Sequence, residues 1–525
     1  MSMSHLTQAL HRAARLYPAH IATICGARRR SYAQVLDRAS RLASGLRQLG
    51  VAPGDRVGVL MANSDRLLES FYAVWWAGGV INPVNTRWTA YEVAYSLDDS
   101  DTRILIVDAH HAGMLDELGL HSRSLRTVVL ATDDLAAEVQ SDGRWDYERL
   151  LDGRAPIADA LRSGSDLAGV FYTGGTTGVA KGVMLSHDNL YFTSLQIIAV
   201  GLVYTDDICL HVAPLFHLAA IAMLLGSMAT TSTQVFAARF EPVAMMEVIQ
   251  RERVSATLLV PTMLQAFIDH PQLPQFQLNS LRMVGYGASP ITSSLLERTL
   301  QRLPWVDFIQ GYGQTEMSPM VTTLSANYHR DARYQSQRHS AGKPAPGVEV
   351  RVVDKKGCDV ATGTVGEILA RGPGVMQGYW NQPELTATSL RGGWMHTGDD
   401  GYMDDDSFVY IVDRTKDMII SGGENVYSVE VENAIAQHPA VITCAVIGVP
   451  SESWGEAVHA VLVCKPGSAK PSFDEIKSHC SRLIANYKCP RSIEFRADMP
   501  LTSMGKVMKN VLRAPYWHDQ QRGVG

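Results

Sequence analysis

The sequence predicts an α/β protein that ends in a smaller α+β unit. Helical segments and apolar strand segments alternate over the first hundred residues, which is typical of a parallel sheet covered by helices. Apolar strands that run into glycine-rich turns recur at 255–262 and 281–289, and such strand ends are where open α/β sheets bind ligands. From about residue 340, short β runs separated by glycines indicate antiparallel strands instead.

Two helices in the first hundred residues carry clear start signals. Each begins with a capping box, in which Ser or Thr is followed three residues later by Gln or Glu: Ser31 with Gln34, and Thr89 with Glu92. The first of them keeps helical apolar spacing as far as Gly50. The apolar runs beside these helices predict buried strands over 55–62, 78–85 and 103–109.

The last hundred residues predict the compact α+β unit. Ser428 is expected to cap a helix whose first turn carries Glu430 and Glu432. A capping box of Ser472 and Glu475 starts another helix, and the apolar runs 440–449 and 457–464 predict strands. We place the domain boundary near 413–417, which gives an N-terminal domain over 1–414 and a C-terminal domain over 415–525.

Composition excludes several classes of protein. The chain has 525 residues, 46% of them hydrophobic and 19% charged, with a net charge of −6, so a basic nucleic-acid-binding surface is not expected. The longest apolar runs, 71–84 and 217–229, are too short for an integral membrane segment. The seven cysteines form no CxxC pair, which argues against a disulfide or zinc framework and predicts a cytoplasmic protein.

A glycine- and threonine-rich stretch, YTGGTTGVAKG over 172–182, predicts a phosphate-binding loop. Its backbone N–H groups can converge on an anion, and Lys181 adds a positive charge. Gly182 stands where a P-loop ATPase requires Ser or Thr, so that class is disfavoured, and no Rossmann fingerprint is present. Taken alone, the stretch could equally be a surface loop.

The same stretch resembles the phosphate signature of the adenylate-forming superfamily, which contains acyl-CoA synthetases, luciferases and peptide-synthetase adenylation domains. It departs from the usual pattern at Gly174, where Ser is usual, and at Ala180, where Pro is usual. Five further motifs follow in the order of the family: 213–220, 311–316, 394–401, 413–432 and 500–510. The chain is most similar to bacterial fatty-acyl- or aryl-CoA ligases.

This resemblance implies a fold and a reaction. The expected fold has two doubly wound sheets and a small β-barrel-like subdomain in the N-terminal domain, and a small mobile C-terminal domain. The expected enzyme is an AMP-forming acyl-CoA synthetase that uses ATP, Mg²⁺ and CoA. It converts a small-molecule carboxylic acid to an acyl-adenylate and pyrophosphate, then to acyl-CoA and AMP. Its oligomeric state could be a homodimer.

The resemblance also assigns roles to residues. The catalytic set is Lys506, Glu316, Thr315 and His217, with Glu316 and Thr177 at the metal. The ATP and AMP contacts are Thr173, Gly174, Gly175, Thr176, Thr177, Gly178, Lys181, Gly287, Ala288, Ser289, Gly311, Tyr312, Gly313, Asp399, Ile411 and Arg414. Lys416 is the hinge, and the CoA contacts are Gly422, Gly423, Glu424 and Trp454. The acyl pocket is formed by Phe216, His217, Ala220, Gly287, Gly311 and Met317.

Six of these residues also have a plain structural explanation. His217 could be a core histidine, Asp399 a turn former and Glu316 a helix cap. Gly422 and Gly423 could form a hairpin turn, and Lys506 could be an exposed lysine near the C-terminus. The occurrence of all six motifs in one order favours the functional interpretation.

The substrate acid is the least determined part. The segments expected around the acyl group, 211–229, 285–290 and 310–320, contain no Lys or Arg, so a second substrate carboxylate is not expected. Small and apolar residues there favour a medium- or long-chain fatty acid, with an aryl or arylpropenoic acid as the alternative. A carrier protein could replace CoA as the acceptor, and a non-catalytic ATP- or acyl-binding relative is the alternative from another class.

Overall fold

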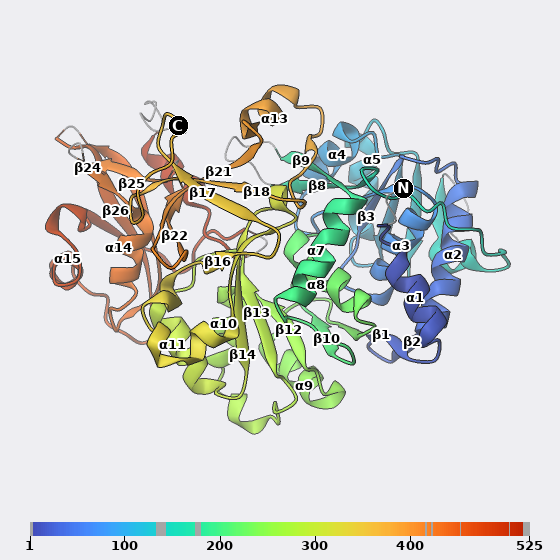
Figure 1. Ribbon diagram of the computed structural model, residues 1–525, viewed down its shortest axis with the longest axis horizontal. Coiled ribbons are helices and arrows are strands. Elements are labelled where there is room, and N and C mark those ends of the chain that lie inside the picture. The colour runs from blue at the N-terminus through green and yellow to red at the C-terminus, as the bar shows by residue number, and fades with distance from the viewer. Residues whose placement is uncertain are drawn as a thin grey trace.

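The computed structural model describes residues 4–132, 143–173, 180–414, 417–421, 424–451, 453–502 and 505–517. Its α/β architecture confirms the predicted fold class. The chain runs from the N-terminal sheets at the right of Figure 1 to the small C-terminal unit at the left. No helix of the described residues combines the length and the apolar character that crossing a bilayer would require.

The first large sheet has eight strands, and most of them are parallel. Their spatial order is β19 (Gly378–Tyr379), β9 (Lys181–Ser186), β8 (Leu167–Thr173), β4 (Val80–Pro83), β3 (Arg56–Leu60), β5 (Ile104–Asp108), β6 (Thr127–Ala131) and β7 (Arg144–Asp146). From β8 to β7 every pairing is parallel, whereas β9 is antiparallel to both β8 and β19. The strands predicted over 55–62, 78–85 and 103–109 are therefore β3, β4 and β5.

The second large sheet has nine strands. Their order is β16 (Lys343–Pro344), β15 (Met320–Leu324), β14 (Asp307–Gly313), β13 (Met283–Gly287), β12 (Ala256–Leu259), β10 (Ile208–His211), β11 (Thr233–Phe236), β1 (Ile21–Cys25) and β2 (Arg28–Ser31). The run from β14 to β1 is parallel, and the strands at both edges are antiparallel. The predicted strands at 255–262 and 281–289 are β12 and β13.

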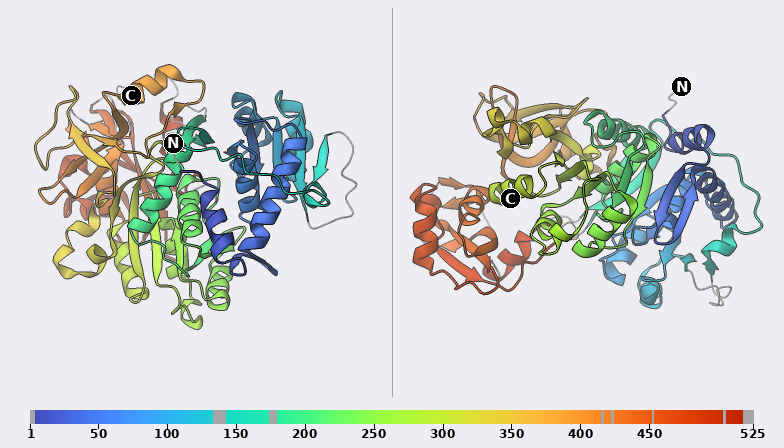
Figure 2. Two further views of the ribbon diagram at one scale, coloured as in Figure 1. Left: turned by 45° about the vertical axis from the view of Figure 1, so that its right-hand side comes forward. Right: turned by 90° about the horizontal axis from the view of Figure 1, so that it is seen from below.

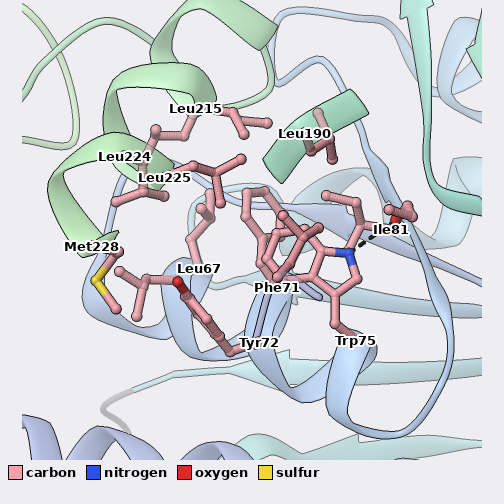
Figure 3. Packing of buried hydrophobic residues seen from close by; sticks show 14 of the residues in the cluster. Leu67, Phe71, Tyr72, Trp75, Ile81, Leu190, Leu215, Leu224, Leu225 and Met228 are labelled. Carbon is pink, nitrogen blue, oxygen red and sulfur yellow. Dashed lines mark hydrogen bonds between the residues drawn. The ribbon is translucent and has the colours of Figure 1, made fainter. Parts of the chain in front are cut away.

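Two helices between the sheets join them into one core. α7 (His187–Ala199) and α8 (Leu218–Ala229) lie between the two strand groups (Figure 1). α8 is apolar on nearly all sides, as a helix buried on all sides must be. Figure 3 shows Leu224, Leu225 and Met228 of α8 close to Phe71 and Tyr72 of α3 (Asp65–Trp76).

The predicted capping boxes are present in the structure. Ser31, Thr89 and Ser472 each accept a hydrogen bond from the backbone three residues later, and the side chain there bonds back. They start α2 (Tyr32–Gln48), α4 (Ala90–Asp99) and α15 (Phe473–Ser481). Gly50 follows α2 with a φ of 97°, a left-handed conformation that glycine adopts without steric cost.

Two smaller sheets follow. The antiparallel sheet expected after residue 340 contains β17 (Glu349–Val353), β18 (Gly366–Arg371), β21 (Trp394–Met403), β20 (Leu390–Arg391) and β22 (Val409–Arg414). The C-terminal sheet contains β24 (Glu424–Val426), β23 (Ile419–Ser421), β26 (Gly455–Cys464), β25 (Val441–Ser451) and β27 (Ser492–Phe495). The C-terminal unit stands apart from the N-terminal sheets in the right-hand view of Figure 2. Sheet membership changes between 414 and 419, and the boundary at 414/415 stays a prediction.

The prediction that Ser428 caps a helix is wrong. Ser428 is instead the first residue of α14 (Ser428–Ile435), and Tyr427 precedes it without a side-chain cap. The Ser428 hydroxyl donates to Asp413 Oδ2 at 2.7 Å, and the Ser428 backbone N–H donates to the same oxygen at 2.6 Å. Asp413 is buried, and its carboxylate therefore takes the hydroxyl that could have capped the helix.

Candidate active site

A cavity of about 570 Å³ lies at the carboxyl ends of the central strands of the nine-stranded sheet. Strands of the eight-stranded sheet and of the antiparallel sheet complete its walls. Ten predicted site residues line it: Thr173, Lys181, His217, Gly287, Ala288, Gly311, Tyr312, Gly313, Thr315 and Glu316. Open α/β sheets bind ligands at this edge, so the cavity is the candidate active site.

The two ends of the predicted phosphate loop are held in a β-ladder. Thr173, the last residue of β8, pairs with Lys181, the first residue of β9. Both side chains line the cavity. The predicted contacts Gly174, Gly175, Thr176, Thr177 and Gly178 lie outside the described residues, and their roles stay predictions.

Glu316 and Lys181 reach the cavity from different sheets, and Tyr379 lies between them. The Tyr379 hydroxyl donates to Glu316 Oε1 at 2.8 Å. The Lys181 ammonium lies 5.5 Å from the centroid of the Tyr379 ring. Burial and the adjacent Glu316 carboxylate raise the pKa of Tyr379 above its ordinary value, so this hydroxyl stays protonated and remains a donor.

Two of the residues predicted to hold the nucleoside are in contact, whereas Asp399, Ile411 and Ser289 are not among the residues that line the cavity. The Tyr312 hydroxyl donates to Asp399 Oδ2 at 2.8 Å, although 87 positions separate the two residues. Arg414 lies opposite Asp399 in the backbone register of β21 and β22. Ile411 pairs with Gly401 two strand positions away, and Ser289 follows Ala288 at the end of β13.

Two glycines at the floor of the cavity are required by close backbone packing. A Cβ on Gly287 would lie 2.2 Å from the carbonyl oxygen of Gly311 on the neighbouring strand. A Cβ on Gly313 would lie 1.9 Å from the carbonyl oxygen of Pro319. These contacts give both positions a structural reason to be glycine.

One wall of the cavity is apolar. It is formed by Ile197, Val200, Leu202, Leu218, Ala219, Ala222, Leu258, Ile309, Pro319 and Met320. Leu202 packs on β13, because a Cβ at Gly285 would lie 2.8 Å from its Cδ1. Ile197 packs on α8 in the same way, with 2.5 Å between its Cγ2 and a Cβ built on Gly226. Both side chains therefore line the cavity from closely packed positions.

Three residues predicted for the acyl pocket do not line the cavity: Phe216, Ala220 and Met317. α8 presents Ala219 and Ala222 to the cavity, which are close in angle around the helix, whereas Ala220 is turned about 160° from Ala222 and is buried in the core. Met317 is also fully buried. Phe216 lies against His217 with its ring tilted, at 4.2 Å between the ring centroids.

His217 lines the cavity as a neutral imidazole. Burial, together with the positive charge of Arg87, lowers its pKa to about 3 from an ordinary value of 6.5. The ring therefore stays uncharged at neutral pH, and it can hydrogen-bond a ligand without adding positive charge to the acyl site.

Cationic side chains reach the cavity from outside the three segments 211–229, 285–290 and 310–320. Arg391 and Lys181 both line it, and Arg391 contacts His396 and Glu367, which line it too. The absence of Lys and Arg from 211–229, 285–290 and 310–320 therefore does not make the cavity free of positive charge. The inference against a second substrate carboxylate loses its basis.

The predicted lysine and CoA residues lie outside the cavity. Within the described residues, nothing beyond Gly398 lines it. Gly505, beside Lys506, packs against the N-terminal domain, since a Cβ on Gly505 would lie 2.2 Å from Thr262 Oγ1 at the start of α10 (Pro261–Ile268). Trp454 is 42% exposed under Arg491, and Glu424 is exposed. Lys416, Gly422 and Gly423 fall outside the described residues.

Sequence reasoning missed Tyr379, Leu202, Ile197 and the group of Arg391, Glu367 and His396. Leu202 and Ile197 are ordinary apolar residues, whose position only helix packing reveals. Tyr379 stands in the run GYWNQP, where the aromatic residue between Gly378 and a proline could have drawn attention. No spacing rule links Tyr379 to Glu316, because they are 63 residues apart.

Comparison with known proteins identifies related sequences over nearly the whole chain. Residues 10–380 match the family model of the AMP-binding enzyme, and residues 430–506 match that of the AMP-binding enzyme C-terminal domain. A feruloyl-CoA synthase of Amycolatopsis sp is 39% identical over 503 residues, which cover 96% of this chain and 97% of that protein.

Two further relatives extend the comparison. A fatty acid–[acyl-carrier-protein] ligase of Streptomyces coeruleorubidus is 34% identical over 511 residues, covering 97% of this chain and 95% of that protein. The crystal structure of ATP-bound MatB from Rhodopseudomonas palustris is similar with a TM-score of 0.87 at 30% identity, covering 98% of this chain and 99% of that one.

Proposed function

The chain belongs to the AMP-binding enzyme family, and we propose that it activates an aryl-substituted carboxylic acid with ATP and transfers the acyl group to CoA. AMP-forming ligation of an acid to CoA is supported by the family match and the CoA-ligase relatives, whereas the aryl class is our own choice. The observation that carries the choice is the limited volume of the cavity, about 570 Å³, together with its apolar wall.

The limited volume of the cavity favours a compact acid over a long chain. The cavity of about 570 Å³ must hold the adenylate as well as the acyl group, so only part of that volume is left for the acid. A flat ring with a short side chain fills such a space and contacts the apolar wall. The feruloyl-CoA synthase relative supports the same class.

A medium-chain fatty acid is the second candidate. Ala219 and Ala222 line the α8 face of the cavity with small side chains, which leave an alkyl chain room to bend. The carrier-protein ligase from Streptomyces supports this candidate and keeps a carrier-protein thiol open as the acceptor.

The donor set of the cavity fits Mg²⁺ that is shared with nucleotide phosphates. Glu316 and Thr315 offer hard oxygen atoms, and Mg²⁺ commonly takes one or two carboxylates and completes its shell with phosphate and water oxygens. The described residues contain no group of three or more His, Cys, Asp or Glu side chains that could hold a metal without the nucleotide. When bound, the ion would neutralise phosphate charge.

The first half-reaction requires an anion to approach a polyanion. A carboxylate oxygen attacks the α-phosphorus of ATP, and the bond from that phosphorus to the pyrophosphate oxygen breaks. Lys181 would hold the outer phosphates, Asp399 would accept hydrogen bonds from the ribose hydroxyls, and Tyr312 would contact the adenine. Lys506 would contact the carboxylate and the α-phosphate and so lower the charge repulsion as they meet.

The second half-reaction breaks the mixed anhydride. A thiolate attacks the acyl carbon, and AMP leaves with the electron pair of the broken carbon–oxygen bond. We place the pantetheine entry near Glu424 and Trp454, whose exposed ring, stacked under Arg491, offers a flat contact surface. Since that surface does not reach the cavity in this structure, the step requires the C-terminal domain to turn.

The proposal is tested with purified protein, ATP, Mg²⁺ and a panel of acids, with pyrophosphate release and thioester formation measured separately. The panel compares ferulate and cinnamate with octanoate and palmitate, at matched concentrations. We expect aryl acids to have the highest kcat/KM and free CoA to yield the thioester. Preference for palmitate would contradict the aryl assignment, and adenylate that accumulates in the presence of CoA would contradict CoA as the acceptor.

A further inference from the structure

Tyr379 joins the two charged groups that the proposed reaction places on the phosphates. We propose that Tyr379 is a positioning residue: its hydroxyl orients the Glu316 carboxylate for the metal, and its ring holds Lys181 beside that carboxylate. The inference rests on the proposed function, and it adds a residue with no assigned role.

The backbone around Tyr379 is tied to both partners. Met376 N–H donates to the carbonyl oxygen of Glu316 at 2.9 Å. On the other side, the N–H groups of Gln377 and Trp380 donate to the carbonyl oxygens of Met184 and Gly182 on β9, at 3.0 and 2.7 Å. The segment 376–380 therefore connects the turn that carries Glu316 with the strand that begins at Lys181.

The side chain of Tyr379 is fixed as well. Its own N–H donates to Thr386 Oγ1 at 2.8 Å, and only 7% of the residue is exposed. A buried phenol with a fixed backbone has little freedom to leave its partner. The hydroxyl therefore holds the Glu316 carboxylate in one orientation before the nucleotide arrives, at no further cost in side-chain entropy.

The chemistry of the contact fits a supporting role for a metal ligand. The hydroxyl donates to Oε1 of Glu316, which leaves the lone pairs of Oε2 pointing elsewhere for a cation. Carboxylates that bind metals are themselves commonly hydrogen-bonded, and loss of such a partner typically lowers metal affinity about 10- to 100-fold. The ring acts separately, since its face attracts the Lys181 ammonium.

Two substitutions separate the two contacts. Tyr379→Phe removes only the hydroxyl and keeps the ring under Lys181. Tyr379→Leu removes both the hydroxyl and the ring. Tyr147→Phe is a matched control, because Tyr147 is another buried tyrosine whose hydroxyl donates to a glutamate, Glu69 Oε2 at 3.1 Å, and it lies outside the cavity.

The readout is ATP binding measured by calorimetry, once with Mg²⁺ and once with a chelator. For Tyr379→Phe we expect the Mg²⁺-dependent gain in ATP affinity to fall about tenfold, while the affinity in chelator stays within twofold of wild type. For Tyr379→Leu we expect an additional loss in chelator. The Tyr147→Phe control should match wild type in both conditions.

A double-mutant cycle with Glu316→Gln tests the route of the effect. If the hydroxyl acts through the carboxylate, Tyr379→Phe adds nothing in the Glu316→Gln background. Equal losses with and without Mg²⁺ in the single mutant, or unchanged binding in both, would overturn the inference. Wild-type protein that binds ATP but shows no acid-dependent pyrophosphate release would count against the proposed function and leave the Tyr379 result readable by itself.

Discussion

The C-terminal unit has two edges with predicted roles, and their surroundings differ. The lysine edge is docked: Gly505, next to Lys506, packs against Thr262 of the N-terminal domain. The edge predicted for CoA faces outward, with Trp454 42% exposed. The cavity between the N-terminal sheets is already assembled without either edge.

This difference bears on the order of the two half-reactions. In this arrangement the lysine edge, which is predicted to serve adenylation, touches the N-terminal domain, while the edge predicted for CoA does not line the cavity. The two predicted roles therefore require two orientations of the C-terminal unit. We therefore expect that a substitution at either edge will impair one half-reaction and leave the other largely unchanged.

Replacement of the lysine should have the largest effect. We expect Lys506→Ala to lower acid-dependent pyrophosphate release by on the order of 100-fold or more, because the charge that meets the carboxylate and the α-phosphate is lost. Thioester formation from supplied acyl-adenylate should be largely retained. Separate assays of the two half-reactions measure this, with the exposed Lys355→Ala as a control. Equal loss in both assays would remove the distinction between the edges.

Crowding of the docked edge should come next. Gly505 has a φ of 69°, and Gly505→Ala adds both backbone strain and a contact with Thr262 Oγ1. The expected cost of about 1–3 kcal/mol should lower adenylation roughly 10-fold and spare the thioester step. Adding Thr262→Ala should recover part of the loss. If Gly505→Ala instead slows only the thioester step, the docked edge has been misassigned.

The exposed edge should give a smaller and opposite pattern. Trp454→Ala should raise the KM for CoA by roughly tenfold or less, since an aromatic contact at an exposed site contributes about 1 kcal/mol. Pyrophosphate release should not change. Trp305→Ala is a control, because Trp305 is equally exposed, at 43%, in the N-terminal domain. A fall in adenylation for Trp454→Ala would place Trp454 with the lysine edge.

The smallest effect concerns the cavity itself. His217→Asn should raise the KM for the acid severalfold and leave the acidic limb of kcat/KM between pH 5 and 8 in place, because His217 does not titrate there. The pKa of His217 is about 3 in the folded protein and about 6.5 in the unfolded chain. Between pH 3 and pH 6.5, therefore, His217 is protonated in the unfolded chain and neutral in the folded protein.

Stability should follow from the same proton balance. In wild type this histidine costs stability as the pH falls below 6.5, by up to about 1.4 kcal/mol per pH unit. The His217→Asn protein should lose that contribution, which thermal melts between pH 4 and 7 would measure. A shift of the acidic limb in activity would show that His217 titrates in the free enzyme and contradict its neutral state.

The elements of the fold were largely predictable from local sequence. Local sequence predicts the capping boxes at Ser31, Thr89 and Ser472 and the strands β3, β5 and β13. These signals are sufficient because each acts within one helical turn or along one strand. Ser428 failed as a cap because a distant carboxylate, Asp413, binds its hydroxyl. Sequence rules that consider only neighbouring residues cannot identify Asp413 as a partner for the Ser428 hydroxyl.

The candidate site was predictable only in part. Residues in the glycine-rich turns line the cavity as expected, since turns at the carboxyl ends of strands meet at one edge of the sheet. The residues of the apolar wall could not be predicted in this way, because the side of α8 that faces the cavity depends on how the helix packs against α7. Ala219 rather than Ala220 faces inward for that reason.

By itself the sequence determined the α/β class, the order of the motifs and the family, because these depend on the identity and spacing of neighbouring residues. Only the tertiary structure decided that Tyr379 contacts Glu316, that Leu202 and Ile197 line the apolar wall of the cavity, and that Lys506 and Trp454 lie on differently placed edges. Each of these is a contact or a separation between segments distant in the chain, and it is fixed by packing rather than by local preference.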